Sequence, residues 1–411
     1  MTHLQSEISN PQSLPPGWRL VRLGEVCEFN PRRPRAFLRN DNAPTTFVPM
    51  SAIDGQTGTI ATPELRPYGE LKRGYTYFGE GDVLFAKITP CMQNGKHAIA
   101  RALTDGVGFG STEFHVIRAE AEIIPEWTHF FIRQPCILQA ATAYFYGAVG
   151  QQRVPEDYLA TLDMPLPPLP EQRRIAAILT KQMENVERAR AAAEAQRDAS
   201  ARVLPAQLSE IFDGPEAEAW PTSRLGDLLI PRREIVHPSD NPSGPATFVG
   251  LEHVESTTGH RIGSLSLEMS ELTGRKPRFA KGDIVYGYLR PYLNKVWLAE
   301  FDGLCSVDQF AYQVRGDTLD AEYLAWFMRS PVYLRRSSVV TTTGQLPRIG
   351  VDEIAAVESP FPRKRDRHAI ARRIRCCLEA LALMRSGIEG TINAVRHLPA
   401  ALLREAFTGR L

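Results

Sequence analysis

Short runs of alternating apolar and polar residues occupy two parts of this chain. They are rich in β-branched and aromatic residues and are separated by Gly, Pro and Asn, which is typical of strands joined by tight turns. The predicted strands are TTFVPM, DVLFAKI and EFHVIRA in the first part, and ATFVGL, DIVYGYL, VWLAEF and FAYQVR in the second. One helix is expected in each part, over residues 125–143 and 320–336. Their aromatic residues are expected to pack in the core: Trp127, Phe130, Phe131, Tyr323, Trp326 and Phe327.

Two longer stretches follow a helical period. Each begins after a Pro-rich segment, at Glu171 and near Asp366, and its apolar residues recur at steps of three and four. This spacing gives one apolar stripe per helix, as in a two-helix coiled coil. About 33 residues precede a Leu-Pro in each, or roughly 50 Å of helix, and Pro205 and Pro399 are expected to end or kink it. Antiparallel pairing is favoured over each helix lying on its own sheet, because such a helix overhangs a domain of this size.

The chain repeats itself with a period of roughly 200 residues, which indicates a duplicated domain. FGEGDVLF at residues 78–85 returns as FAKGDIVY at 279–286, and the other echoes keep their order. The expected fold is α+β: two tandem mixed β-rich domains joined by two long antiparallel helices, with a pseudo-twofold internal repeat. The predicted boundaries are a first domain at 1–168, a central helical spacer at 169–214, a second domain at 215–362 and a C-terminal helical spacer at 363–411. Two similar but non-identical surfaces suit double-stranded DNA.

The composition permits DNA binding only if charge is segregated. The net charge is +1, with 43% hydrophobic and 23% charged residues. Basic residues gather in two loops: Arg32, Arg33, Arg35 and Arg39, then Arg275, Lys276, Arg278 and Lys281. The six cysteines show no CxxC spacing, and no signal peptide or membrane-length apolar run is visible. We therefore expect a soluble, cytoplasmic protein without a metal site.

Catalytic motifs are missing from the sequence. There is no GxxxxGK[ST], no GxGxxG after a strand and no HExxH. The Asn-Pro-Pro-aromatic tetrapeptide of amino-methylating enzymes is absent as well, since Asn30-Pro31 continues into Arg32-Arg33. The chain is accordingly expected not to be an enzyme, with no catalytic residues and no cofactor of its own.

Two motifs carry a resemblance to a known family. They are Glu171-Gln172-Arg173-Arg174-Ile175-Ala176 before the first long helix, and Leu402-Leu403 with Ala406-Phe407-Thr408-Gly409 at the end. With the duplication, the chain resembles the specificity subunit of type I restriction–modification enzymes over its whole length from Trp18. Residues 362–366 depart from the family's Glu-Gln pattern at the second helix.

The resemblance implies a division of labour. Each globular domain would be a target recognition domain for half of an asymmetric, bipartite DNA site, and the paired helices would set the spacing. Two methyltransferase subunits, which bind S-adenosylmethionine, would dock on the helices. Restriction motor-nuclease subunits, using ATP and Mg, would join them.

Candidate contact residues lie in loops at matching places in the two halves. Basic side chains can hold phosphates or guanine, amides can pair with adenine, and Thr or Tyr can touch a thymine methyl. The DNA-binding candidates are Lys87, Thr89, Gln93, Asn94, Lys96, Gln151, Arg153, Tyr288, Arg290, Tyr292, Asn294, Lys295, Gln345 and Arg348. The partner-binding candidates on the helices are Ile175, Leu179, Met183, Val186, Ile370, Ile374, Leu381 and Ile388.

Each assignment has an alternative. A single basic loop residue can be a solvated charge, and Gly150-Gln151 and Gly344-Gln345 can be plain turns. For the whole chain, a structural coiled-coil adaptor without DNA readout stays open, as does a self-contained nuclease or methylase, for which no motif is visible. Steep loss of DNA affinity with salt separates a DNA reader from an adaptor.

Overall fold

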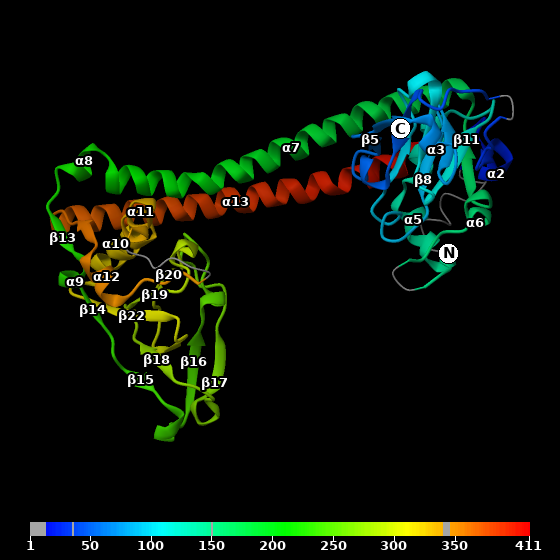
Figure 1. The fold of residues 1–411 in the computed structure, drawn as a ribbon. Helices are drawn as coiled ribbons and strands as arrows, with labels where there is room; N and C mark the ends of the chain where they lie inside the picture. Colours follow the sequence, from blue (N-terminus) through cyan, green and yellow to red (C-terminus); the bar gives the residue numbers. More distant parts are fainter. Residues whose placement is uncertain (1–13, 35–36, 149–150, 340–345) are drawn as a thin grey trace. The chain divides into compact units, whose positions relative to one another are not determined.

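The computed structural model describes residues 14–34, 37–148, 151–339 and 346–411. The chain forms two compact units, each considered by itself. The first runs to Glu194 and includes Gly390–Leu411, and the second is Ala195–Glu389. Figure 1 shows that both contain sheets, short helices and parts of two long helices, α7 (Leu169–Asp213) and α13 (Lys364–Phe407). No helix in the described ranges has the length and apolar character needed to cross a membrane.

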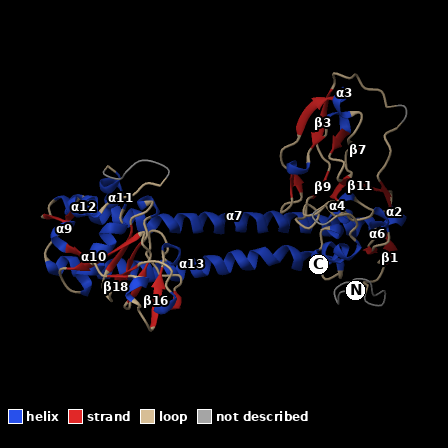
Figure 2. Ribbon diagram, turned by 60° about the horizontal axis from the view of Figure 1, so that its bottom comes forward, coloured by secondary structure: helices blue, strands red, loops and turns tan. Residues whose placement is uncertain are grey.

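Two four-stranded sheets form the centre of the first unit (Figure 2). The first has the order β6-β3-β10-β7, in which β3 and β10 are parallel, and the second is antiparallel with the order β2-β11-β8-β9. A further antiparallel pair joins β1 to β12, and another joins β4 to β5. The strands are β1 (Arg19–Arg22), β2 (Cys27–Phe29), β3 (Pro44–Val48), β4 (Ile53–Asp54), β5 (Thr59–Ile60), β6 (Glu64–Pro67), β7 (Thr76–Gly79), β8 (Val83–Ala86), β9 (His97–Ile99), β10 (Val107–Gly110), β11 (Phe114–Ala119) and β12 (Asp163–Leu166).

The second unit repeats this plan. Its antiparallel sheet has the order β14-β22-β19-β20, and its mixed sheet β15-β18-β21-β16-β17 again contains one parallel pair, β16 with β21. A final antiparallel pair joins β13 to β23, as β1 joins β12. The strands are β13 (Thr222–Arg224), β14 (Leu229–Pro231), β15 (Ile235–Val236), β16 (Pro245–Val249), β17 (Leu265–Glu268), β18 (Lys276–Phe279), β19 (Ile284–Gly287), β20 (Val296–Leu298), β21 (Gly303–Cys305), β22 (Gln309–Val314) and β23 (Glu358–Pro360). The duplicated, β-rich fold predicted from the sequence is therefore confirmed.

The repeated Gly-Asp motif is a structural turn. Gly81 and Gly282 have φ of +85° and +89°, a conformation that favours glycine. The next residue, Asp82, accepts a hydrogen bond from the Gly79 amide (2.7 Å) and binds Arg118 through both carboxylate oxygens. Asp283 does the same with the Ala280 amide (2.8 Å), but its arginine is Arg232, from a different strand region. Both halves thus contain the same turn, but the arginine that pairs with its aspartate comes from a different part of the domain in each half.

Each part contains two consecutive helices where the sequence predicted one. Residues 125–143 contain α4 (Pro125–Ile132) and α5 (Pro135–Ala141), and the second unit has α10 (Thr318–Arg329) and α11 (Pro331–Ser338). The prediction of one continuous helix was wrong because proline disfavours the helical conformation at the residue before it, here Gln134 and Ser330. The remaining short helices are α2 (Leu23–Val26), α3 (Tyr68–Leu71), α6 (Glu156–Ala160), α8 (Pro215–Glu218), α9 (Leu225–Leu228) and α12 (Val351–Ala356).

In the first unit, the start of α7 and the end of α13 lie side by side and share one core. Ile175 and Leu179 of α7 are fully buried there with Phe407 of α13. The Phe407 ring lies 4.4 Å from that of Trp127 and 5.5 Å from that of Phe131. The end of α13 therefore completes the core of the first domain.

The second unit has the same arrangement with the helices exchanged. Leu208 and Phe212 near the end of α7 are buried with Ile374 near the start of α13. Phe212 lies 5.4 Å from Tyr323 and 5.5 Å from Phe327, as Phe407 lies against Trp127 and Phe131. Within each unit the two helices are antiparallel, as predicted, and Trp127, Phe131, Tyr323, Trp326 and Phe327 are core residues.

The long helices do not end at their prolines. Pro205 and Pro399 lie inside α7 and α13, which are 45 and 44 residues long. Each proline removes one backbone hydrogen bond. Burial of Leu208 and Phe212 beyond Pro205, and of Leu403 and Phe407 beyond Pro399, favours continuing the helix into a core.

Candidate nucleic-acid interface

Each domain brings two loops together beside its antiparallel sheet. In the first domain, the loop after β8 contacts the segment before α6. Ile88 and Arg153 form an isolated antiparallel β-bridge, and the Thr89 amide donates to the Gln152 carbonyl (2.9 Å). In the second domain, Leu289 and Arg348 form the corresponding antiparallel β-bridge, and the Arg290 amide donates to the Pro347 carbonyl (2.8 Å). The predicted contact loops are therefore neighbours in both domains.

Two of the predicted DNA-binding lysines are internal anchors. The Lys96 ammonium donates to the carbonyls of Met50 (3.0 Å) and Ile53 (2.9 Å). The Lys295 ammonium donates to the carbonyls of Leu251 (2.7 Å) and Val254 (2.9 Å). Because each charge is satisfied by backbone oxygens of its own domain, these lysines fix the loop rather than offer a cation to phosphate.

Asn294 is also structural. Its side chain is 4% exposed, and its Nδ2 donates to the Arg329 carbonyl (2.7 Å). An adenine edge cannot reach an amide that is buried in this way. The prediction that Asn294 pairs with adenine is therefore wrong for this conformation.

An arginine bonded to backbone carbonyls lies behind each loop, half-buried Arg133 and buried Arg329, and neither was singled out from the sequence. Arg133 donates to four carbonyls, those of Gly95, His97, Gly55 and Gln56. Its counterpart Arg329 donates from Nε to the Val296 carbonyl (2.8 Å). Burial lowers the pKa of Arg133 to about 10 and that of Arg329 to about 9. A signal existed, because both stand at the same place in the repeat, two residues before a proline.

The first domain presents mainly amides. Gln93, Asn94 and Gln151 are exposed, whereas Lys87 and Thr89 are half-buried. Arg153 forms a two-bond ion pair with Glu113, at 2.9 and 2.7 Å. This pairing raises the pKa of Arg153 and lowers that of Glu113, so the guanidinium is neutralised by its own domain.

The second domain presents a different set. Arg290, Tyr292 and Arg348 are exposed, and the Arg290 guanidinium has no hydrogen bond or ion pair within the described ranges. Tyr288 stacks on Phe310 with ring centres 4.3 Å apart and donates to the Val307 carbonyl (2.8 Å). Burial raises the pKa of its hydroxyl. Gln345 lies outside the described residues.

The early basic loop is only partly free. Arg32 and Arg33 are exposed, but Arg33 donates to the Tyr68 hydroxyl (2.6 Å), and Arg39 pairs with Asp105 (2.9 Å). Arg35 lies outside the described residues.

Several helix residues predicted to bind partners are buried within the chain itself. Ile175, Leu179, Ile374 and Ile388 are buried, so their side chains are not available to a second protein in this conformation. The other four are half-buried: Met183, Val186, Ile370 and Leu381.

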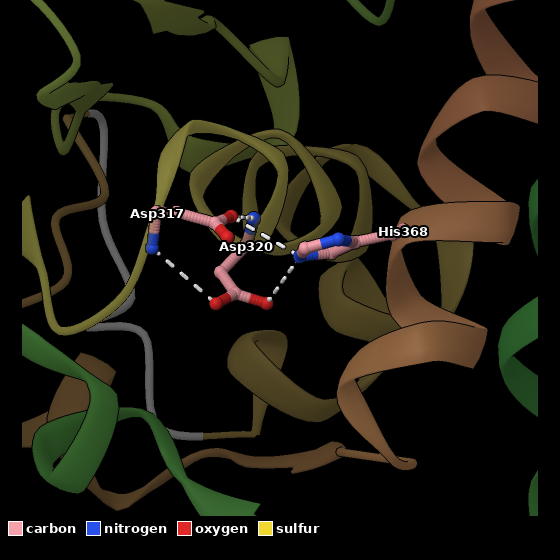
Figure 3. Close-up of side chains that lie close together, drawn as sticks. All are labelled: Asp317, Asp320 and His368. Atoms are coloured by element: carbon pink, nitrogen blue, oxygen red, sulfur yellow. Dashed lines mark hydrogen bonds and ion pairs between the residues drawn. The ribbon is translucent and has the colours of Figure 1, made fainter.

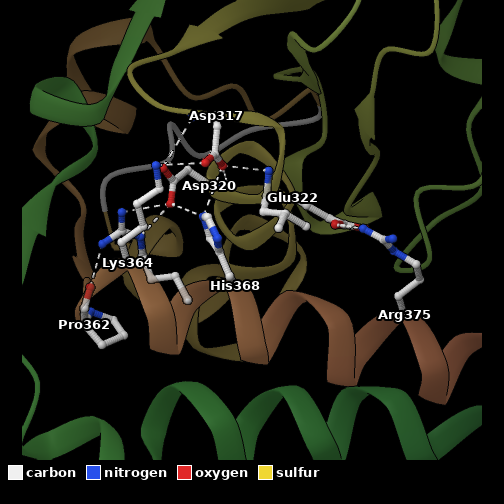
Figure 4. Close-up of polar contacts among 9 residues, drawn as sticks. Asp317, Asp320, Glu322, Pro362, Lys364, His368 and Arg375 are labelled. Atoms are coloured by element: carbon white, nitrogen blue, oxygen red, sulfur yellow. Dashed lines mark hydrogen bonds and ion pairs between the residues drawn. The ribbon is translucent and has the colours of Figure 1, made fainter.

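Asp317, Asp320 and His368 have the donor types and spacing of a metal site, with ligand atoms within 4.8 Å of one another (Figure 3). Their carboxylates are already engaged, however. Lys364 pairs with Asp317 (2.9 Å) and Arg367 with Asp320 (2.8 Å), and Asp317 also caps α10 by accepting from the Leu319 amide. The Lys364 ammonium, and after it the Asp320 amide, lower the pKa of Asp317 to about 2. The cluster is better explained as an ion network that fixes the start of α13 (Figure 4).

This network explains the departure at residues 362–366. In the first unit, buried Gln172 accepts from the Ile124 amide (3.0 Å) and donates to the Pro167 carbonyl (2.8 Å), which attaches α7 to α4. Arg367 does the equivalent in the second unit, donating to the Pro362 carbonyl (2.6 Å) and to Asp320 of α10. An amide is thus replaced by an ion pair at the same joint.

Sequence comparison identifies the first domain. Residues 15–193 match the family described as type I restriction modification DNA specificity domain. The type I restriction enzyme EcoEI specificity subunit of Escherichia coli is 33% identical over 214 residues, which are 52% of this chain and 36% of that protein. The EcoAI specificity subunit of the same organism is 32% identical over the same shares. The chain thus spans little more than a third of the length of these relatives.

Solved structures resemble the whole chain in fold. One, described as the structural basis underlying complex assembly and conformational transition of the type I R-M system, has a TM-score of 0.77 and 24% identity, covering 97% of this chain and 99% of that one. The HsdS subunit from Thermoanaerobacter tengcongensis has a TM-score of 0.66 and 24% identity, covering 97% and 98%.

Proposed function

We propose that this chain is a type I restriction–modification specificity subunit that recognises DNA, with each sheet-rich domain binding one half of an asymmetric, bipartite target. One observation supports this most directly. The same loop pair is fixed by the same anchors in both domains, Lys96 with Arg133 and Lys295 with Arg329, yet it presents different side chains. A shared scaffold with divergent contact residues suits two readers of different sequences.

We propose that the chain works with other subunits. Two methyltransferase subunits that bind S-adenosylmethionine would dock on α7 and α13, whose exposed faces carry many small and charged residues. Restriction motor-nuclease subunits, with ATP and Mg, would complete the complex. In this proposal the long helices also set the spacing between the half-sites.

The chain itself would be non-catalytic. The loop pairs offer amides, arginines and tyrosines for hydrogen bonding, and Glu113 beside them is engaged in a two-bond ion pair with Arg153. Methyl transfer to adenine would come from the partner subunits.

Mapping methylated adenines in cells that contain the complex tests the proposal. The wild type should give a split motif with two defined halves. Arg290→Ala should relax or abolish recognition of one half only, by about 1–3 kcal/mol. Gln93→Ala, at an exposed amide in the corresponding loop of the first domain, should affect the other half. Equal loss at both halves for either variant, or DNA affinity that does not fall with salt, would contradict two independent readers.

A further inference from the structure

A short turn in the second domain holds apolar side chains in solvent. Tyr292 is 62% exposed and Leu293 is 36% exposed, within the single 3₁₀ turn Pro291–Leu293. The residues on either side, Arg290 and Asn294, have φ of 52° and 49°, in the left-handed region that L-residues rarely adopt. Such backbone strain persists only where the surroundings hold it, and it gathers at functional sites.

The turn is held at several points. Pro291 is buried, Asn294 donates to the Arg329 carbonyl (2.7 Å), and the Arg290 amide donates to the Pro347 carbonyl (2.8 Å). Lys295 is fixed by two further carbonyls. These contacts hold the turn in one conformation, so Tyr292 and Leu293 are presented to solvent at fixed positions.

The neighbourhood is apolar at its centre and basic around it. Leu346 is 51% exposed beside Pro347, and Val307, whose carbonyl accepts from Tyr288, is 40% exposed. Arg275 and Arg348 both lie close enough to act on the charge of the Tyr288 hydroxyl. Together with the exposed Arg290, these arginines surround the apolar side chains with positive charge. A polyanion such as duplex DNA therefore suits this surface better than the apolar face of another protein.

The first domain has no such apolar pair in the corresponding loop. Between Pro90 and Lys96 the only large apolar side chain, Met92, is fully buried, and Gln93 and Asn94 are exposed. The two domains thus offer different chemistry from the same anchored position.

We propose that Tyr292 and Leu293 contact thymine methyl groups in the major groove of the second half-site, whereas Gln93 and Asn94 bind adenine edges in the first. The thymine methyl is the apolar group that bases expose in that groove, and amides match the donor and acceptor of adenine. This inference rests on the proposed function and adds which base groups each domain recognises in its half of the target.

The test uses the full chain in complex with its methyltransferase partner and duplexes that carry the mapped target. Each thymine of the second half-site is replaced in turn by uracil, which lacks only the methyl group. Affinity should fall about fourfold for each contacted methyl, the value expected for one buried methyl or methylene. In a Tyr292→Ala, Leu293→Ala variant the same replacement should have no effect. Leu265→Ala, at a comparably exposed leucine on β17, should keep the wild-type response.

Three results would overturn the inference. They are unchanged affinity for every uracil duplex, equal sensitivity of the double variant, and a rise in 2-aminopurine fluorescence in the second half-site, which would mean insertion between bases instead of methyl contact. Failure of the proposed function is distinct, because the wild-type complex would then not discriminate the mapped duplex from a scrambled one.

Discussion

At the scale of single residues, three buried histidines distinguish the first domain from the second. His97 is fully buried, stacks on Phe85 at 4.2 Å, and accepts a hydrogen bond on Nδ1 from the Ala86 amide. His129 is buried behind it and bonds the His97 carbonyl. At the matching positions the second domain has Val296 and Ala325.

These histidines make the first unit sensitive to acid. Burial lowers the pKa of His129 from 6.5 to about 3, and it also lowers those of His97 and His115. The unfolded chain therefore binds more protons below pH 6.5, and stability should fall as the pH drops below that value. For His129 the loss is up to about 1.4 kcal/mol per pH unit from 6.5 towards 3, and His97 and His115 add to it in the same direction.

Urea unfolding at pH 8 and pH 5, monitored separately for each unit, checks this prediction. In the second unit no histidine within the described ranges is fully buried, so its transition serves as an internal control. A larger acid shift in the second unit would refute the assignment.

Individual contact residues were the hardest feature to predict from the sequence. The loops could be located because they recur in the repeat. Whether a lysine in them faces DNA or a carbonyl depends on strands far away in the chain: Lys96 reaches Met50 and Ile53, and Lys295 reaches Leu251 and Val254. Asn294 looked like a reader for the same reason, since nothing local shows that it is buried.

At the scale of elements, helix periodicity predicted α7 and α13, but not what fixes their first turns. The joint between α10 and α13 is a buried ion pair, Asp320 with Arg367, where the first unit has Gln172. A buried pair contributes little over a neutral alternative, but losing one member leaves an uncompensated charge.

Asp320→Ala should therefore destabilise the second unit by about 3–5 kcal/mol, because Arg367 would stay buried without a counter-ion. Adding Arg367→Gln should recover at least half of this loss by copying the amide of the first unit. Denaturant titration of both variants measures it, with the exposed Asp366→Ala as control. A double variant no more stable than the single one would show that the charge is not the cause.

The aromatic ends of the long helices allow a second test at this scale. Phe407→Ala should destabilise the first unit and Phe212→Ala the second, each by about 3–5 kcal/mol, since each ring is fully buried among aromatic residues. Leu398→Ala, at a side chain 44% exposed on α13, should change stability by under about 0.5 kcal/mol. If both phenylalanine variants weakened the same unit, the assignment of each ring to its core would be wrong.

At the scale of the whole molecule, the duplication was visible in the sequence because the Gly-Asp turn and the aromatic helix recur in order. The exchange of helix ends was not. The two long helices end in similar sequences, Leu204-Pro205 with Phe212 and Leu398-Pro399 with Phe407, and nothing local tells which core each one enters. Only the contacts of Phe212 with Tyr323, and of Phe407 with Trp127, decide this.

Removing residues 402–411 should therefore unfold the domain farthest away in sequence. We expect the shortened chain to lose the cooperative transition of the first unit and to keep that of the second, whose core uses Leu208 and Phe212 instead. Limited proteolysis with mass spectrometry measures which unit is digested. Protection of the first unit in the shortened chain would contradict the role given to Leu403 and Phe407.

Because the end of α13 belongs to the first core, the first domain cannot complete its folding as soon as it is synthesised. The first domain leaves the exit tunnel before Leu403, Ala406 and Phe407 are synthesised, so it waits with an open core while the second domain is made. Its core closes only when the end of α13 has been made, and a product that stops before Leu403 is left with that core open for proteases to attack.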